Sequence, residues 1–183
     1  MQSSLDGSAL VNSQPPRTSK TFDNYANEDI LPRVRSNSTT YQNVDIVFDV
    51  YEESSLKVEA QSKRDKGIRR RVTPTSKTPQ NWKSFWRDNN NKTELFHFLA
   101  DRLSEANMLC LEYVCYNHVI ALEDLAPCTH KEADPHIFGH TRHAAMDGSK
   151  ALMIKANGTD VVVKCGLHLA REDIFDRFQC MKR

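Results

Sequence analysis

Several signatures that would identify common classes of protein are missing from this sequence of 183 residues. No apolar window is long enough for a transmembrane helix, and the N-terminus lacks the basic and apolar regions of a signal peptide. The five cysteines are an odd number and form no Cys-x-x-Cys pair, which favours reduced thiols over a disulfide framework. We therefore expect an intracellular protein, nuclear or cytoplasmic, that is not secreted and has no membrane partner.

The motifs of several enzyme classes are also absent. The sequence contains no glycine-rich phosphate loop, no nucleophile elbow and no HExxH metalloprotease motif. His130 and Glu132 match the start of the zinc-deaminase motif, but the P-C-x-x-C that this chemistry requires does not follow. The net charge is only +1, so any contact with nucleic acid must come from a local basic cluster.

Such a cluster belongs to the stretch that organises our interpretation, VDIVFDVYEESSLKVEAQSKRDKGIRRR, at residues 44–71. Its continuous run of β-branched and aromatic residues is typical of a parallel strand buried on both faces. Asp49 ends this run, where ligands usually meet an open parallel sheet. A helical segment then places Lys57 and Arg64 two turns apart along one face. A carboxylate followed by cations suits a site for a metal and a phosphodiester.

The basic cluster itself predicts contacts with DNA or RNA. Its six cations lie close together in the sequence, within residues 63–71: Lys63, Arg64, Lys66, Arg69, Arg70 and Arg71. Phosphate contacts need cations of this kind and no particular base sequence. The ordinary alternatives stay open, because a run of Lys and Arg is often a solvated face and an aspartate ending a strand is often a turn residue or a helix cap.

The order of apolar patterns favours an α/β layer with a mostly parallel sheet. Strands are expected at 44–51, 108–116 and 151–155, and helices at 22–35, 91–103, about 130–146 and 171–178. In the helix at 91–103, Asn91 is expected to cap and Glu94 to complete a capping box. Residues 65–80 read as an exposed basic and proline-rich loop, and the two tryptophans of residues 81–86 either pack in the core or stack on bases.

A second candidate site lies within residues 127–163. Glu132 and Asp134 flank one alanine at a helix start, and Asp160 opens an apolar run after a strand. Carboxylates from such distant points can converge on divalent cations, which activate a water and stabilise a leaving oxygen. As an alternative, Glu132 and Asp134 are first-turn acids favoured by the helix dipole. The helical spacing of three histidines also offers a zinc alternative, through His136, His140 and His143.

These motifs, in this order, resemble the PIN-like and flap-endonuclease-like nuclease superfamily. VFD, SLK, KR and RRR resemble its second strand and following helix, and Glu-Ala-Asp, a helix, a glycine, a strand and an aspartate resemble its acidic core. A group of PIN-like proteins common in invertebrate genomes is similar over most of the chain. The matching blocks are KTFDNYA (20–26), VDIVFDVY (44–51), GIRRRV (67–72), PQNWKSF (79–85), NKTELFHFLA (91–100) and CTHKEAD (128–134).

The resemblance implies a three-layer α/β fold over residues 21–183, incomplete at the C-terminus, with residues 1–20 either disordered or the remnant of a first strand. It implies a divalent-metal-dependent nuclease, a hydrolase that acts on structured DNA or RNA with Mg²⁺ or Mn²⁺. Lys57 and Arg64 would grip the scissile phosphate. The implied metal ligands are Asp6, Asp49, Glu132, Asp134 and Asp160.

The chain also departs from the family pattern. The family's Asp-Thr-Asp reads Gly158-Thr159-Asp160, which removes one carboxylate, and the sequence ends before the family's late acid. The apolar run that should precede Asp6 is missing, so Asp6 is expected to be a poor ligand. We therefore expect cleavage to be weak or absent. A catalytically dead remnant that still binds nucleic acid, and a gene fragment without stable function, remain the alternatives.

Overall fold

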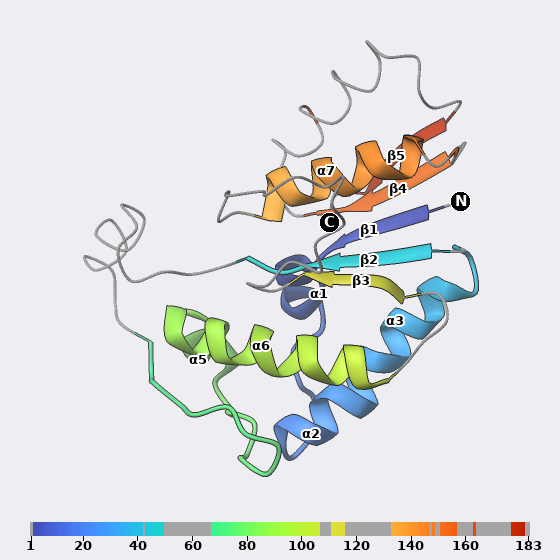
Figure 1. Cartoon of the computed structure of the whole chain (residues 1–183). Helices are drawn as coiled ribbons and strands as arrows, with labels where there is room; N and C mark the ends of the chain where they lie inside the picture. Colours follow the sequence, from blue (N-terminus) through green and yellow to red (C-terminus); the bar gives the residue numbers. More distant parts are fainter. Residues whose placement is uncertain are drawn as a thin grey trace.

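The computed structural model describes residues 2–41, 43–49, 67–106, 111–115, 133–146, 148, 151–156, 163 and 177–181. Over these residues the chain forms a five-stranded parallel sheet with helices on both of its faces (Figure 1). The strands are β1 (Gln2–Asp6), β2 (Asn43–Val47), β3 (Leu111–Cys115), β4 (Ala151–Lys155) and β5 (Arg177–Met181). The predicted α/β class and the parallel sheet are confirmed.

The strand order β3-β2-β1-β4-β5 places β1 at the centre of the sheet. All four strand pairings are parallel, and β1 pairs with β2 on one side and with β4 on the other. The order therefore reverses direction beside β1, as in doubly wound α/β proteins. In such sheets, ligands bind beyond the carboxyl ends of the strands near the reversal.

The helices form two layers. The helix α7 (Ala133–Met146) covers one face and contacts β1 and β2. On the other face lie α1 (Gly7–Ser13), α3 (Leu31–Ser38) and α6 (Asn89–Glu105) (Figure 1). α2 (Phe22–Asn24) lies farther from the sheet, and α5 (Trp82–Trp86) contacts α6. Gly148, which follows α7, has a positive φ of 80°, consistent with the predicted end of this helix. No helix in the described part of the chain has the length and apolar character to cross a bilayer.

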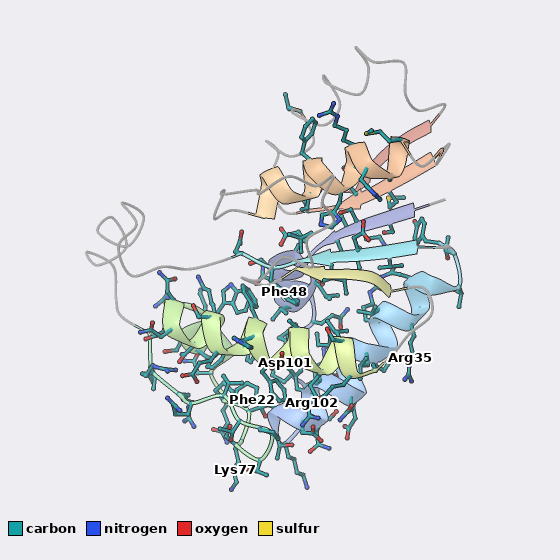
Figure 2. All side chains as sticks on the ribbon, in the orientation of Figure 1. Phe22, Arg35, Phe48, Lys77, Asp101 and Arg102 are labelled. Carbon is teal, nitrogen blue, oxygen red and sulfur yellow. The ribbon has the colours of Figure 1, made fainter. Side chains whose placement is uncertain are left out.

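The main apolar core lies between the sheet and α6. Phe48, just beyond β2, packs on Phe96 of α6 with 5.1 Å between ring centroids, and Figure 2 shows it between the two layers. Buried side chains from the sheet and from the helical segments complete this core, among them Leu5, Val44, Ile46, Phe22, Tyr25, Ile30, Val34, Leu95, Leu99 and Leu103. The apolar stripe predicted for the helix at 91–103 is thus confirmed.

A proline is accommodated inside the helix that was predicted at 22–35. The helical segment runs through α2, the π-helical turn η1 (Tyr25–Ile30) and α3, where Pro32 is in the first turn. In η1 the N–H of Leu31 bonds the carbonyl of Ala26, five residues back. A proline has no N–H to give and clashes with the carbonyl four residues before it, so widening the preceding turn lets the helix continue. The helix predicted at 22–35 therefore passes Pro32 through a local π segment.

Three predicted elements need correction. Of the two alternatives for residues 1–20, disorder is wrong and a first strand is observed: these residues form the central strand β1 and the helix α1, because β2 and β4 bond both edges of β1. Residues 177 and 178 belong to β5, so the helix predicted at 171–178 is wrong at its end. Phe178 is paired with Leu152 of β4.

The N-cap of α6 also differs from the prediction. Asp88 caps α6 by accepting from the N–H of Asn91 at 3.0 Å, so the capping box predicted for Asn91 and Glu94 is wrong. Both side chains bond another segment, described below.

Candidate functional site at the carboxyl edge of the sheet

Two predicted metal ligands end neighbouring strands. Asp6 is the last residue of β1 and lies opposite Val47, the last residue of β2. Asp49 follows Val47 by two residues, so both aspartates lie at the carboxyl edge, beside the reversal of strand order. The strand that was expected to be missing before Asp6 is present, and it is the central one. The reason given for treating Asp6 as a poor ligand therefore does not hold.

The Asp-Gly pair at the end of β1 has a clear packing requirement. Asp6 is buried, and its Oδ1 accepts a hydrogen bond from the N–H of Ala9 at 3.1 Å, which caps α1. A Cβ added at Gly7 would lie only 2.2 Å from Cδ1 of Phe48. Glycine is thus needed for the Phe48 ring to pack beneath the end of β1, and this contact holds the ends of β1 and β2 together.

A lysine lies near Asp49, and sequence reasoning did not single it out. Lys92 of α6 is partly buried, and its Nζ lies 3.3 Å from Oδ1 of Asn89 and 5.7 Å from the centre of the Trp86 ring. Burial lowers the pKa of Lys92, and the charges of Asp49 and Asp88 only partly offset this lowering. The carboxyl edge therefore combines acids with a partly desolvated cation.

Of the remaining predicted metal ligands, only Asp134 lies within the described part of the chain. Asp134 is the second residue of α7, whose first turn lies at the carboxyl edge, on the side of the strand arrowheads in Figure 1. This placement fits both the metal interpretation and the first-turn interpretation. Among the described residues, no group of three His, Cys, Asp or Glu side chains could hold a metal ion. The following predicted site residues lie outside the described part of the chain: Lys57, Lys63, Arg64, Lys66, Glu132 and Asp160.

One histidine of the zinc alternative turns toward the sheet. His140 is buried, and its Nδ1 lies 3.4 Å from Oδ2 of Asp45 in the middle of β2. Asp45 lies opposite Ser4 of β1, so both side chains occupy the sheet face that α7 covers. This buried pair joins α7 to the sheet and gives His140 a structural contact in place of a zinc ligand shared with His143.

The arginines of residues 67–72, which we call the arginine loop, are held against α6. Asn91 is fully buried and bonds the loop with both ends of its amide. Its Oδ1 accepts from Nη1 of Arg69 at 2.9 Å and from the N–H of Arg70 at 2.8 Å, while its Nδ2 donates to the carbonyl oxygen of Ile68 at 2.8 Å. The side chain that was expected to cap a helix thus fixes the backbone of the predicted loop.

Glu94 makes the second attachment. Its Oε2 accepts from the N–H of Val72 at 2.8 Å, and its Oε1 forms an ion pair with Arg69 and lies 3.5 Å from Nη1 of Arg71. Partial burial raises the pKa of Glu94, but the hydrogen bonds from Arg69 and Val72 and the charges of both arginines outweigh burial and leave it below its usual value.

Packing also fixes the start of the arginine loop. A Cβ added at Gly67 would lie 2.3 Å from the carbonyl oxygen of Ser84, so only glycine allows the loop backbone to approach the α5–α6 junction this closely. The blocks GIRRRV, PQNWKSF and NKTELFHFLA, which the sequence keeps apart, therefore form one contiguous structure.

The three arginines differ in what they can offer a ligand. The guanidinium of Arg69 is used by Asn91 and Glu94. Arg70 bonds Asn91 through its backbone, and its side chain is exposed. The side chain of Arg71 is 81% exposed. Arg70 and Arg71 are therefore the arginines of this loop whose side chains are most accessible to a phosphate.

Both tryptophans are partly buried and pack against the main core, which favours the first of the two alternatives. Trp82 stacks on Phe85 and Trp86 with ring centroids 4.9 and 6.1 Å apart, and it also contacts Tyr25 at 5.4 Å. Trp86 meets Phe96 edge-on at 5.8 Å.

Comparisons of this chain with models of protein families, with curated proteins and with solved structures found no match.

Proposed function

We propose that this chain is a nuclease-like domain of the PIN and flap-endonuclease type, which binds structured DNA or RNA and cleaves it weakly or not at all. The observation that carries the proposal is the placement of Asp6 and Asp49 at the ends of two adjacent parallel strands, beside the reversal of strand order. This edge is where open α/β sheets bind their ligands. We choose the PIN-like and flap-endonuclease-like superfamily because the sequence motifs resemble those of that superfamily and occur in the same order.

The residues of this edge fit Mg²⁺ or Mn²⁺ in kind, because carboxylate oxygens are the ligands that hard divalent cations prefer. Such a cation, when bound, would supply water activation and charge stabilisation to phosphodiester hydrolysis. Asp6 and Asp49 would hold it, together with Asp134, Glu132 and Asp160. Since Gly158 replaces an acid of the family pattern, the set is one carboxylate short, and we expect weak cleavage for that reason.

Nucleic-acid binding places fewer demands on the site. Phosphate contacts need only accessible cations, and the exposed side chains of Arg70 and Arg71 stand on a backbone fixed by Asn91 and Glu94. This observation favours the second candidate function, a catalytically dead domain that binds nucleic acid through the arginine loop and through the cations that precede it in the sequence, Lys57, Lys63, Arg64 and Lys66.

A cleavage assay on branched and single-stranded DNA and RNA, with magnesium or manganese, tests the nuclease proposal. We expect slow turnover or none, and any turnover should disappear in Asp49→Asn. Asp101→Asn is the matched control, because Asp101 of α6 has a side chain that is 65% exposed. Robust cleavage that survives Asp49→Asn would overturn the proposed site.

Manganese binding, measured by electron paramagnetic resonance, separates the two candidates when no cleavage is seen. A nuclease-like site predicts bound manganese that Asp49→Asn weakens and Asp101→Asn does not. A dead binding domain predicts no such site, together with oligonucleotide binding that Arg70→Ala and Arg71→Ala weaken. A cooperative thermal transition distinguishes both from a fragment without stable structure.

A further inference from the structure

We propose that Lys92 is a phosphate-binding residue of the carboxyl-edge site, which contacts a phosphodiester oxygen of the bound nucleic acid. This inference rests on the proposed function, since it assigns a further residue to the same site. Lys92 lies outside the basic cluster of residues 63–71 and comes from a different element, α6.

Packing places Lys92 beside the end of β2. Phe48 precedes Asp49 and stacks against Phe96, with 5.1 Å between the ring centroids. Lys92 lies one turn before Phe96 on the same face of α6, and that turn is nearer the carboxyl edge (Figure 1). The ring contact therefore brings the Lys92 side chain toward Asp49.

The surroundings of Lys92 position its ammonium group. Trp86 lies beneath it at 5.7 Å from ring centroid to Nζ, and Asn89 accepts from it at 3.3 Å. Trp86 is itself fixed by its edge contact with Phe96. A cation that is partly buried on an aromatic face, at an edge lined with acids, loses part of its hydration, and it gains most from an anion that approaches from solvent.

Asp49 and Asp88 are the acids whose charges act on Lys92 in the absence of a ligand. A phosphodiester must therefore compete with Asp49 for the ammonium. Neutralising Asp49 should strengthen phosphate binding at Lys92. A lysine that serves only as a structural counter-ion for Asp49 would bind no phosphate while Asp49 is charged, so the loss of binding in Lys92→Met of the otherwise unmodified chain tests the proposal without a metal.

The experiment measures binding of inorganic phosphate and of a short oligothymidylate, in the presence of a chelator, by the emission of Trp86 in a Trp82→Phe background. Lys92→Met should abolish the emission change and weaken oligothymidylate binding by about tenfold, the effect of losing one charge-assisted contact. Lys92→Arg should keep most of the affinity. Lys83→Met is the matched control, because Lys83 is an exposed lysine of α5, and it should change little.

Asp49→Asn should raise the affinity for inorganic phosphate, and adding Lys92→Met should remove this gain. Anisotropy of a labelled oligothymidylate with the unmodified tryptophans provides a second measurement if Trp82→Phe fails to fold. Unchanged binding in Lys92→Met, with Arg71→Ala still weakening it, would overturn the role of Lys92 and leave the proposed function standing. Absence of oligonucleotide binding in the unmodified chain would overturn both.

Discussion

Nδ1 of His140 lies 3.4 Å from Oδ2 of Asp45, and the two side chains are only 5% and 1% exposed. The pair joins α7 to the middle of β2, so it connects one helical layer to the sheet. A buried pair of this kind is costly to break from one side, because the remaining group keeps its burial and loses its partner.

His140→Leu should therefore destabilise the fold by about 3 kcal/mol or more, measured by urea unfolding. Replacing both residues, as Asp45→Val with His140→Leu, should recover most of that loss, since well-packed apolar side chains can replace a buried pair. The control is His97→Leu. Its Nδ1 lies 3.3 Å from Asp101, but both side chains are about two-thirds exposed, so the change should stay within about 0.5 kcal/mol. Equal losses at the two histidines would contradict this view of the buried pair.

Asn91→Ala should release the arginine loop. The substitution removes the acceptor for Arg69 and Arg70 and the donor to the carbonyl oxygens of Ile68 and Phe85. The carbonyl of Phe85 loses a buried hydrogen bond and the arginine loop loses three partly buried ones, and we expect a loss of about 2 kcal/mol or more in unfolding free energy. Limited trypsin digestion should cut faster after Arg69, Arg70 and Arg71. The control is Asn90→Ala, at the exposed neighbouring position, which should leave both measurements unchanged. If trypsin cuts the arginine loop at the same rate in both variants, Asn91 does not hold the loop against α6.

Glu94 should make the stability of the fold depend on acid pH. Because its pKa in the folded chain lies below the unfolded value of about 4.3, its contribution is complete above that pH and is lost as the pH falls through the folded-state pKa. Glu94→Gln should thus cost stability at neutral pH, and the cost should shrink as the pH falls below about 4. Urea unfolding at several pH values checks this. Glu105→Gln, at an exposed site of the same helix, is the control, and a pH-independent cost for Glu94→Gln would refute the prediction.

The parts of the fold that the sequence predicted are those with strong apolar patterns. The runs that became β2 and β4, and the periodic stripes of α6 and α7, identify their own structure, because buried side chains recur at the spacing of each element. β1 could not be predicted in this way. Its sequence QSSLD holds one apolar residue, and Ser3 and Ser4 are buried with no hydrogen-bond partner for their hydroxyls in the described structure. Only the neighbouring strands make this segment a strand.

The residues of the candidate site likewise divide into those with a local sequence signal and those without one. Asp49 could be identified because it ends a conspicuous apolar run, and Asp6 only because of a family resemblance. The bonds of Asn91 and Glu94 to the arginine loop join residues more than twenty positions apart, so local spacing indicated a helix cap instead. Lys92 carried no local signal either, because its environment depends on Asp49 and Trp86 from other elements.

Gly7→Ala should disturb the carboxyl edge through a single contact. The added methyl group would lie 2.2 Å from Cδ1 of Phe48 and 2.4 Å from Cε1, so the ring must move, and Asp49 follows that ring in the chain. Overpacking of this kind costs about 1–3 kcal/mol, and we expect a loss in that range from urea unfolding.

A smaller side chain at residue 48 should relieve the clash. Phe48→Leu is destabilising alone, but the double variant Gly7→Ala with Phe48→Leu should be more stable than the sum of the two losses predicts, by about 0.5 kcal/mol or more. Gly148→Ala is the contrasting control. Its φ of +80° makes alanine strained, yet among the described residues no heavy atom beyond its chain neighbours lies within 4 Å of the added Cβ. Its cost should therefore add to that of Phe48→Leu without coupling. Additive losses for Gly7 and Phe48 would show that the ring does not set the position of the strand ends, and the proposed alignment of Asp6 with Asp49 would lose its support.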